Sequence, residues 1–348
     1  MHKLLNPKTY INKLNREIKR NQLYKNDKKI YQNAPNFRVW KTNFSEGINE
    51  PWVNHFYFDG FIPDSLRKDY VNSYYKPQLE YFSVFGKRNT IKKSKSPVKI
   101  FWTGEDVVNN YTSFRDQCIE DADLILGFTS PEKYGLPKTD KFIRFPLWIL
   151  YYFDANDTKD TIYEKVKKIN SIKYPKTEFC SLIARHDPNS IRKSIIDNLN
   201  QVEIVKCAGR YLHNDDSLKN NFNDDKIKYL QQFMFNLCPE NTNIEGYVTE
   251  KLFQSFDSGA IPIYWGYNEN PEPEVVNPKA IIFYNPENPE QMIQQTKELW
   301  TNKNAYEDFI NQPRLLDSAV DFVYNLQTNV KQRYEEIFIE KGLLCDER

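Results

Sequence analysis

The sequence predicts an α/β protein with two domains, because short apolar strands alternate with helices along a chain of 348 residues. That length exceeds one typical domain and suits two domains of ordinary size. Residues 179–184, 189–199 and 202–207 predict a strand, a helix and a second strand, which form a βαβ unit with parallel pairing. Residues 233–266 then predict a strand, a polar loop, a helix and a short strand. Both patterns favour parallel sheets covered by helices.

The composition excludes several classes of partner. Lys and Arg number 48 against 47 Asp and Glu, so the net charge of +1 gives no overall field for nucleic acid or an anionic membrane. No run approaches the roughly 20 apolar residues of a transmembrane helix, and the first 20 residues lack the apolar segment of a signal peptide. We therefore expect no transmembrane segment and a cytoplasmic location, with peripheral attachment to a membrane left open.

The cysteines favour a reducing compartment. None of the five forms a C-x-x-C pair. Cys180, Cys207 and Cys238 fall in apolar runs that predict strands, so we expect buried free thiols at these positions.

Lys251 is the first residue that suggests a binding site. It lies in the first turn of a helix that we expect to begin after Thr249 and to end at Gly259, and a cation there faces the positive end of the helix dipole. An anionic ligand at the helix start would offset that cost. A lysine that points into water is equally consistent. Further polar residues follow the same strand end, where ligands of open α/β sheets bind: Glu240, Asn241, Tyr247 and Glu250.

A second cation occupies a similar position. Arg192 lies near the start of the helix predicted over residues 189–199. Two cations at helix starts in one domain predict one anion bound between them, and a phosphate fits this pattern. Arg185 and His186 are close enough in sequence to be alternatives to Arg192.

The run CPENTNIEGYVTEKLFQSFDSGAIPIYWG, residues 238–266, resembles the signature of the α-1,3-fucosyltransferase family. That signature reads F-x-L-x-x-E-N, then G-Y-V-T-E-K-[LI], then [IV]-P-I-Y-W-G. The resemblance implies a GT-B-like architecture, in which two Rossmann-like domains face each other across a cleft, and a GDP-fucose donor site in the second domain. Without an N-terminal membrane anchor, the chain resembles soluble bacterial or viral members of the family.

The resemblance also implies roles for individual residues. Glu105 follows the strand predicted over residues 98–102 in a T-G-E sequence, where the family has its catalytic base. Arg192 ends a P-x-x-x-R segment and, like Lys251, would hold the donor diphosphate. The remaining donor contacts would be Asn241 to phosphate, Glu250 to the ribose hydroxyls and Tyr247 to the donor pocket.

Metal is not expected to be required. The two cations would take the place of the divalent ion that other glycosyltransferases use, so we predict no metal ligands and no cofactor, with stimulation by a divalent metal left open. Asp121 and Asp123 have the D-x-D form of a metal site but run directly into an apolar strand, so we expect a structural role for both.

We expect four parts: an N-terminal extension over residues 1–35, an acceptor-side domain over 36–165, a GDP-fucose-binding domain over 172–315, and a C-terminal helix over 316–348 that packs back on the first domain. The extension is either an amphipathic helix near residues 10–23 or unstructured.

The predicted reaction is inverting transfer of L-fucose from GDP-β-L-fucose to a hydroxyl of an oligosaccharide acceptor, with O3 of an N-acetylglucosamine-type residue as the expected position. Two alternatives remain. One is another nucleotide-sugar transferase on the same scaffold, and the other is a glycan-binding relative without catalysis.

Overall fold

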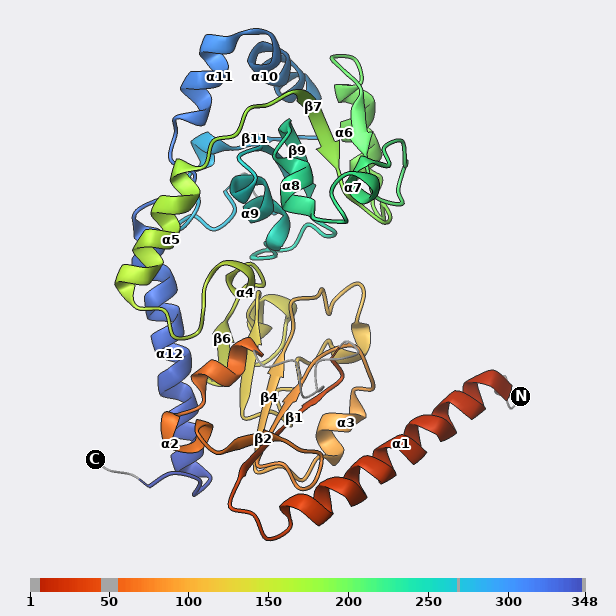
Figure 1. Cartoon of the computed structure of the whole chain (residues 1–348), viewed down its shortest axis with the longest axis vertical. Helices are drawn as coiled ribbons and strands as arrows, with labels where there is room; N and C mark the ends of the chain where they lie inside the picture. The colour runs from red at the N-terminus through yellow and green to blue at the C-terminus, as the bar shows by residue number, and fades with distance from the viewer. Residues whose placement is uncertain (1–6, 45–55, 268–269, 346–348) are drawn as a thin grey trace. The chain divides into compact units, whose positions relative to one another are not determined.

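The computed structural model describes residues 7–44, 56–267 and 270–345, and it describes side chains in the first helix from Glu17 onward. The chain forms two compact units. The first unit comprises Met1–Leu126, Pro131–Ile143 and Asn329–Arg348, and the second comprises Gly127–Ser130 and Arg144–Thr328. Each unit contains one sheet, and each is described by itself below (Figure 1).

The sheet of the first unit has six strands in the order β2-β1-β3-β4-β5-β6. Each strand from β2 to β5 pairs in parallel with its neighbour in that order. All four residues of β3 and of β5 are buried, as expected for strands that are covered on both faces. The strand bounds are β1 (Phe37–Thr42), β2 (Tyr70–Asn72), β3 (Leu79–Phe82), β4 (Val98–Trp102), β5 (Leu124–Gly127) and β6 (Phe142–Arg144).

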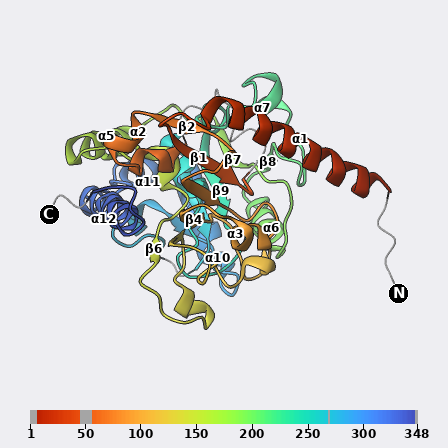
Figure 2. The same ribbon diagram turned by 90° about the horizontal axis from the view of Figure 1, so that it is seen from below.

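In the part of the N-terminal extension that the structure describes, residues 7–31 form a helix. The helix α1 (Pro7–Tyr31) is longer than the 10–23 segment considered from the sequence, and it projects from the first sheet (Figure 1 and Figure 2). Its last turns dock on the loop after β2, where Tyr24 packs edge-on against Tyr75 at 5.1 Å and the Asp27 carboxylate accepts a hydrogen bond from the Tyr74 N–H at 2.6 Å. These contacts show why its C-terminal end is fixed to the unit.

Short helices and one long helix complete the first unit. Residues 329–340 of α12 (Ser318–Glu340) pack on the first sheet, where Phe338 contacts Phe37 edge-on at 5.7 Å and the Tyr334 and Tyr81 hydroxyls lie 3.4 Å apart. The short elements are η1 (Tyr57–Phe61), α2 (Asp64–Arg67), α3 (Asn89–Lys93), η2 (Thr112–Phe114) and η3 (Pro131–Tyr134).

The Asp121 and Asp123 carboxylates have protein partners, in agreement with the expected structural role. Asp121 pairs with Arg88 at 2.8 Å, and Asp123 accepts the Lys99 N–H at 2.8 Å and pairs with Lys341 at 2.7 Å. Across the described ranges, no group of three or more His, Cys, Asp or Glu side chains could hold a metal ion.

The sheet of the second unit has five parallel strands in the order β11-β10-β9-β7-β8. Its centre is β9 (Phe233–Pro239), in which all seven residues are buried. Pro239 is the last paired residue of this strand, opposite Trp265. The other strands are β7 (Glu178–Leu182), β8 (Val205–Cys207), β10 (Ile261–Trp265) and β11 (Ile282–Phe283).

Helices cover this second sheet. The connection from β7 to β8 contains α6 (Ile191–Leu199), which confirms the predicted βαβ unit. The helix after the signature loop, α9 (Glu250–Asp257), begins after Thr249 and stops before Gly259, which has φ +68°. The remaining helices are α4 (Ile149–Tyr152), α5 (Lys159–Ser171), α7 (Ser217–Asn220), α8 (Lys226–Leu230), η4 (Pro278–Ala280), α10 (Pro289–Thr301) and α11 (Lys303–Ile310).

Two further expectations concern burial. Cys180, Cys207 and Cys238 are buried free thiols, as predicted. In the part of the chain that the structure describes, no helix combines the length and apolar character needed to cross a membrane.

Candidate donor site at the start of α9

The candidate site forms where β9 ends. Pro239 leads into Glu240 and Asn241, the loop returns through Tyr247, and α9 then begins with Glu250 and Lys251. The α6 helix brings Arg192 to the same place, as its guanidinium contacts the Pro239 carbonyl at 3.4 Å. Five of the six residues predicted to act therefore lie in the second unit, at the carboxyl end of its central strand.

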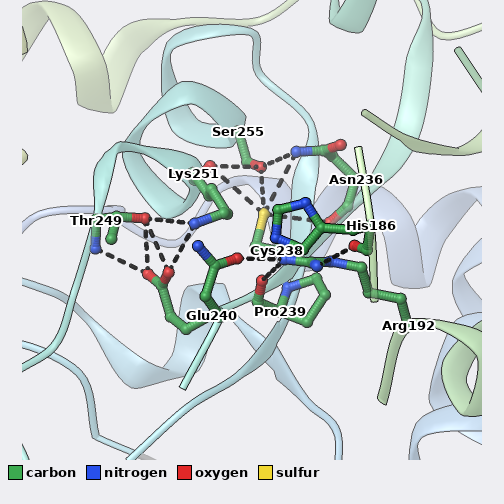
Figure 3. Close-up of polar contacts among 10 residues, drawn as sticks. His186, Arg192, Asn236, Cys238, Pro239, Glu240, Thr249, Lys251 and Ser255 are labelled. Atoms are coloured by element: carbon green, nitrogen blue, oxygen red, sulfur yellow. Dashed lines mark hydrogen bonds and ion pairs between the residues drawn. The ribbon is translucent and has the colours of Figure 1, made fainter. Parts of the chain in front are cut away.

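Lys251 does not point into water. Its ammonium lies 2.9 Å from Glu240 Oε2 and donates to Thr249 Oγ1 at 2.9 Å (Figure 3). The Glu240 side chain is fully buried, and its carboxylate also accepts the Thr249 N–H at 2.8 Å. The cost of a cation at the helix start is therefore offset by an anion of the protein itself.

Electrostatics keep the Lys251 ammonium charged. Burial disfavours the cation, but the carboxylates of Glu240 and Glu250 outweigh burial, so the pKa of Lys251 lies above its ordinary value. Its side chain remains 24% exposed. A charged ammonium that is held by one carboxylate and is still partly exposed can attract a further anion.

Arg192 is buried, with 4% of its surface exposed. Its guanidinium donates to the His186 carbonyl (Figure 3). It also donates to Asn241 Oδ1 at 2.7 Å. Burial lowers the pKa of this guanidinium from its ordinary value, although Asp187 and Glu240 act in the opposite direction. The two alternatives to Arg192 are Arg185 and His186, and both are exposed. Arg192 is buried and hydrogen-bonded to Asn241, so the structure favours Arg192 as the residue of this site.

The start of α6 also has an anion of its own. The Asp187 carboxylate accepts the backbone N–H groups of Arg192 at 3.2 Å and Lys193 at 2.9 Å. From the sequence we expected a bound ligand to compensate the cations at both helix starts. In the structure, Asp187 and Glu240 supply part of that compensation.

A small cavity of about 60 Å³ joins the two helix starts. Arg192 lines it from α6, and Glu250 and Lys251 line it from α9. The rest of its wall is mixed. The apolar part comes from Leu182, Ile183, Leu230, Leu237 and Pro239, and the polar part from Lys226, Asn236 and Gln254. The arrangement offers cationic groups beside a carboxylate, and a recess of this size suits a phosphate group of a larger ligand.

A buried layer of polar side chains borders the cavity, which Asn236 also lines. Asn236 of β9 donates to Ser255 Oγ of α9 at 2.7 Å, and the Cys238 thiol lies 2.9 Å from the same hydroxyl (Figure 3). Ser181 Oγ of β7 donates to Asn236 Oδ1 at 3.1 Å. Burial raises the pKa of the Cys238 thiol to about 12, so it serves as a neutral packing and hydrogen-bonding group. The layer joins β7, β9 and α9 and fixes the helix on the sheet.

Tyr247 is buried, with 3% of its surface exposed, and its ring meets Phe128 edge-on at 4.7 Å. The turn before it is held by Arg144, which donates to the Gly246 carbonyl at 3.1 Å and forms an ion pair with Glu272. From the sequence we assigned no role to Arg144 or Glu272. Arg144 lies far before the signature, and Glu272, which follows soon after its end, belongs to no local pattern that indicates a role.

Glu105 lies in the first unit, immediately after β4. Its N–H donates to Thr103 Oγ1 at 3.0 Å, which closes the expected turn at the carboxyl end of the strand. The next residue, Asp106, is fully buried and accepts the N–H groups of Val108 at 2.8 Å and Asn109 at 3.1 Å. Asp106 thus shapes the turn that contains Glu105, a role that the sequence alone does not indicate.

Solved structures of other proteins share this architecture. A crystal structure of an α1,3-fucosyltransferase is similar with a TM-score of 0.58 at 22% sequence identity, over 87% of this chain and 93% of that chain. A crystal structure of an α1,3-fucosyltransferase with GDP-fucose gives a TM-score of 0.53 at 23% identity, over 85% and 90% of the two chains. The two parallel sheets and this likeness define the class, an α/β protein of the GT-B type.

Two family models match consecutive parts of the sequence. The model of the α-(1,3)-fucosyltransferase FucT N-terminal domain matches residues 42–151, and the C-terminal model of glycosyltransferase family 10 (fucosyltransferase) matches residues 172–331. The chain belongs to the fucosyltransferases of glycosyltransferase family 10.

Curated relatives agree with that assignment. The α-(1,3)-fucosyltransferase FucT of Helicobacter pylori is 29% identical over 71% of this chain. The GDP-fucose protein O-fucosyltransferase 3 of Xenopus laevis is 28% identical over 56%, and the putative fucosyltransferase R654 of Acanthamoeba polyphaga mimivirus is 29% identical over 52%. The matches span 54%, 44% and 31% of these three relatives, so the chain corresponds to about half of their length or less.

Proposed function

We propose that this protein transfers L-fucose from GDP-β-L-fucose to a hydroxyl of a glycan acceptor, with inversion at the anomeric carbon. The observation that carries the proposal is the placement of Arg192, Glu250 and Lys251 around one cavity at the carboxyl end of β9. Family membership and the name of the Helicobacter relative support fucose as the sugar and O3 of an N-acetylglucosamine-type residue as the position.

In this proposal the donor is held by charge and shape. Arg192 and Lys251 bind the diphosphate, and Asn241, which is fixed by Arg192, presents its amide to a phosphate oxygen. Glu250 accepts hydrogen bonds from the ribose hydroxyls, and Tyr247 lines the pocket. When the bond between the sugar and the phosphate breaks, the negative charge that develops on GDP is stabilised by the two cations. A divalent ion is then not required for this step.

Glu105 is proposed as the catalytic base. It takes the proton of the acceptor hydroxyl while that oxygen forms a bond to C1 of fucose and the C1–O bond to GDP breaks. Attack from the face opposite the leaving group converts the β-linked donor into an α-linked product, through an oxocarbenium-like transition state. This assignment is supported by the family resemblance and by the position of Glu105 in the turn after β4.

Thermal shift tests the donor. GDP should raise the melting temperature of the protein, whereas UDP and ADP at the same concentration should not, because a ligand stabilises the folded state that binds it. Equal shifts with all three nucleotides would contradict specificity for guanine and would favour another nucleotide-sugar transferase.

Turnover tests the reaction. Purified protein is incubated with GDP-fucose, EDTA and separate acceptors: N-acetyllactosamine, lacto-N-biose and N-acetylglucosamine. An acceptor peptide extends the panel, because some relatives are named protein O-fucosyltransferases. Fucosylated glycan in the presence of EDTA supports the proposal in full. Product that forms only when Mn²⁺ or Mg²⁺ replaces EDTA would overturn metal independence, and product with the peptide alone would overturn the glycan acceptor.

A further inference from the structure

The turn over residues 245–247 is held in place at several points, and it leads directly into the donor site. Gly246 has φ +76°, a conformation that L residues other than glycine adopt only at a cost. A Cβ atom at this position would lie 2.6 Å from the Phe128 carbonyl oxygen and 3.3 Å from Arg144 Nε. The backbone of the turn is therefore pressed against these two groups, and only glycine fits there.

Arg144 holds the turn through three sides of its guanidinium. Nε donates to the Phe128 carbonyl at 3.0 Å, one terminal nitrogen donates to the Gly246 carbonyl at 3.1 Å, and both terminal nitrogens bond to Glu272 at 3.0 and 2.5 Å. Only a planar guanidinium can make this set of bonds, because an ammonium is a point charge without fork geometry. Arg144 thus connects three separate segments of the second unit.

Glu272 orients the guanidinium. Its side chain is 2% exposed, and Oε1 also accepts a hydrogen bond from the buried Trp148 indole at 3.0 Å. Its backbone has φ +52°, in the left-handed region that a glutamate rarely adopts. Burial opposes the charge of Arg144, but Glu272 outweighs burial and raises the pKa of Arg144. A buried carboxylate in a costly backbone conformation indicates a position selected for geometry.

We propose that Arg144 and Glu272 are positioning residues of the donor site, which fix the 245–247 turn and through it the start of α9. The inference rests on the proposed function. Two contacts hold the turn on the 127–130 segment: Tyr247 packs on Phe128, and Thr129 Oγ1 donates to the Glu245 carbonyl. Two residues after the turn, Thr249 donates to the Glu240 carboxylate and accepts a hydrogen bond from Lys251. The position of the turn therefore affects the orientation of Lys251. Without the hydrogen bonds of the Arg144 guanidinium, the turn would no longer hold Tyr247 and Thr249 at fixed positions.

The test uses Arg144→Lys and Glu272→Gln, both conservative in size, in the full chain. For each variant, the Kd of GDP by calorimetry, the KM and kcat for GDP-fucose, and the melting temperature are measured. The matched control is Lys165→Met. Lys165 forms an ion pair with Asp157 at 2.6 Å, with side chains 31% and 7% exposed, close to the 33% and 2% of Arg144 and Glu272.

We expect Arg144→Lys and Glu272→Gln to raise the Kd of GDP and the KM of GDP-fucose about tenfold at temperatures well below their melting points, with a smaller change in kcat. Lys165→Met should lower the melting temperature by a similar amount and leave Kd and KM unchanged. If the arginine variant does not fold, Glu272→Gln carries the test, because it retains the shape of the side chain and an oxygen for Trp148.

The outcomes separate the two proposals. Wild-type protein that does not bind GDP overturns the proposed function and, with it, this inference. Wild-type protein that binds GDP, with both variants showing the wild-type Kd and KM and only a lower melting temperature, overturns the positioning role alone. A tenfold loss of GDP affinity in the control Lys165→Met would also overturn it, since loss of any buried ion pair would then have the same effect.

Discussion

At the scale of single residues, the environment of Lys251 shows both the reach and the limit of sequence reasoning. A cation in the first turn of a helix predicts a nearby anion, and the structure places one there, the Glu240 carboxylate at 2.9 Å. From the sequence, Glu240 belongs to the same group of polar residues, but nothing there pairs it with Lys251. The pairing depends on the path of the loop from residue 240 to 249, and no local pattern determines that path.

The pairing of Lys251 with Glu240 predicts that GDP affinity and thermal stability can be lost separately. Lys251→Ala should weaken GDP binding and lower the melting temperature, because Glu240 would keep its charge in a buried position without its cation. The double variant Lys251→Ala with Glu240→Gln should recover part of the melting temperature and none of the GDP affinity. Calorimetry and thermal unfolding of the three proteins measure this. Recovery of GDP affinity in the double variant would show that Lys251 acts on the donor only through Glu240.

For Glu105 we predict loss of transfer activity without loss of GDP affinity. Glu105→Gln removes the base and preserves size, so transfer should fall by about 10²–10⁴-fold, the usual contribution of general base catalysis. The Kd of GDP should stay at the wild-type value, because the proposed donor contacts belong to the second unit. The control is Glu120→Gln, an exposed carboxylate of the same unit. Transfer by Glu105→Gln at the wild-type rate would remove Glu105 from the mechanism.

At the scale of elements, the strands and helices of the second unit were the most predictable. The short strand expected at the end of residues 233–266 is β10, and α9 lies between Thr249 and Gly259 as predicted. Thr249, however, makes no side-chain capping bond to the helix, and its hydroxyl bonds to Glu240 and Lys251 instead. The residue type marked the helix start correctly, whereas its bonding depends on tertiary contacts that the sequence does not reveal.

The C-terminal end of α5 carries a prediction about stability. Arg314 is 5% exposed, and its guanidinium donates to the carbonyls of Ile169 at 2.8 Å and Ile172 at 2.6 Å. Arg314→Met would leave these acceptors without their charged donor, so the free energy of unfolding should fall by about 2 kcal/mol. Urea denaturation measures the loss. Lys167→Met, at an exposed position of the same helix, should change stability by less than about 0.5 kcal/mol.

At the scale of the whole molecule, alternating strands and helices were enough to predict two parallel α/β sheets. The strand order was not predictable, since β1 lies between β2 and β3 in the first sheet and this order follows from long-range pairing. The sequence also does not predict that Arg144 belongs to the second unit. Residues 127–130 and 144–328 belong to that unit. Sequence reasoning therefore grouped the residues that are proposed to bind the donor, and it did not find the residues that support them.

The response of the folded protein to pH depends in part on Lys176, a partly buried cation in the second unit. The Lys176 ammonium donates to the carbonyls of Gln231 and Ser258, both at 2.9 Å, near the ends of α8 and α9. Burial, with a smaller contribution from the charge of Arg314, lowers the pKa of Lys176 to about 7 in the folded protein. Between pH 7 and the ordinary value of 10.5, the unfolded chain therefore binds a proton that the folded protein does not bind. In this range the contribution of Lys176 to stability increases as the pH rises.

Lys176→Met isolates this contribution, because methionine keeps the apolar stem and cannot titrate. Its lost hydrogen bonds lower stability by an amount that does not depend on pH, whereas the wild-type protein alone loses stability as the pH falls from 10 to 7. The melting temperature of the variant relative to wild type should thus rise as the pH falls through this range and become constant below about pH 7. Thermal unfolding of both proteins from pH 6 to 10 measures the difference. A difference that is constant over the whole range would show that Lys176 stays protonated in the folded state, held by the two helix-end carbonyls against the cost of burial.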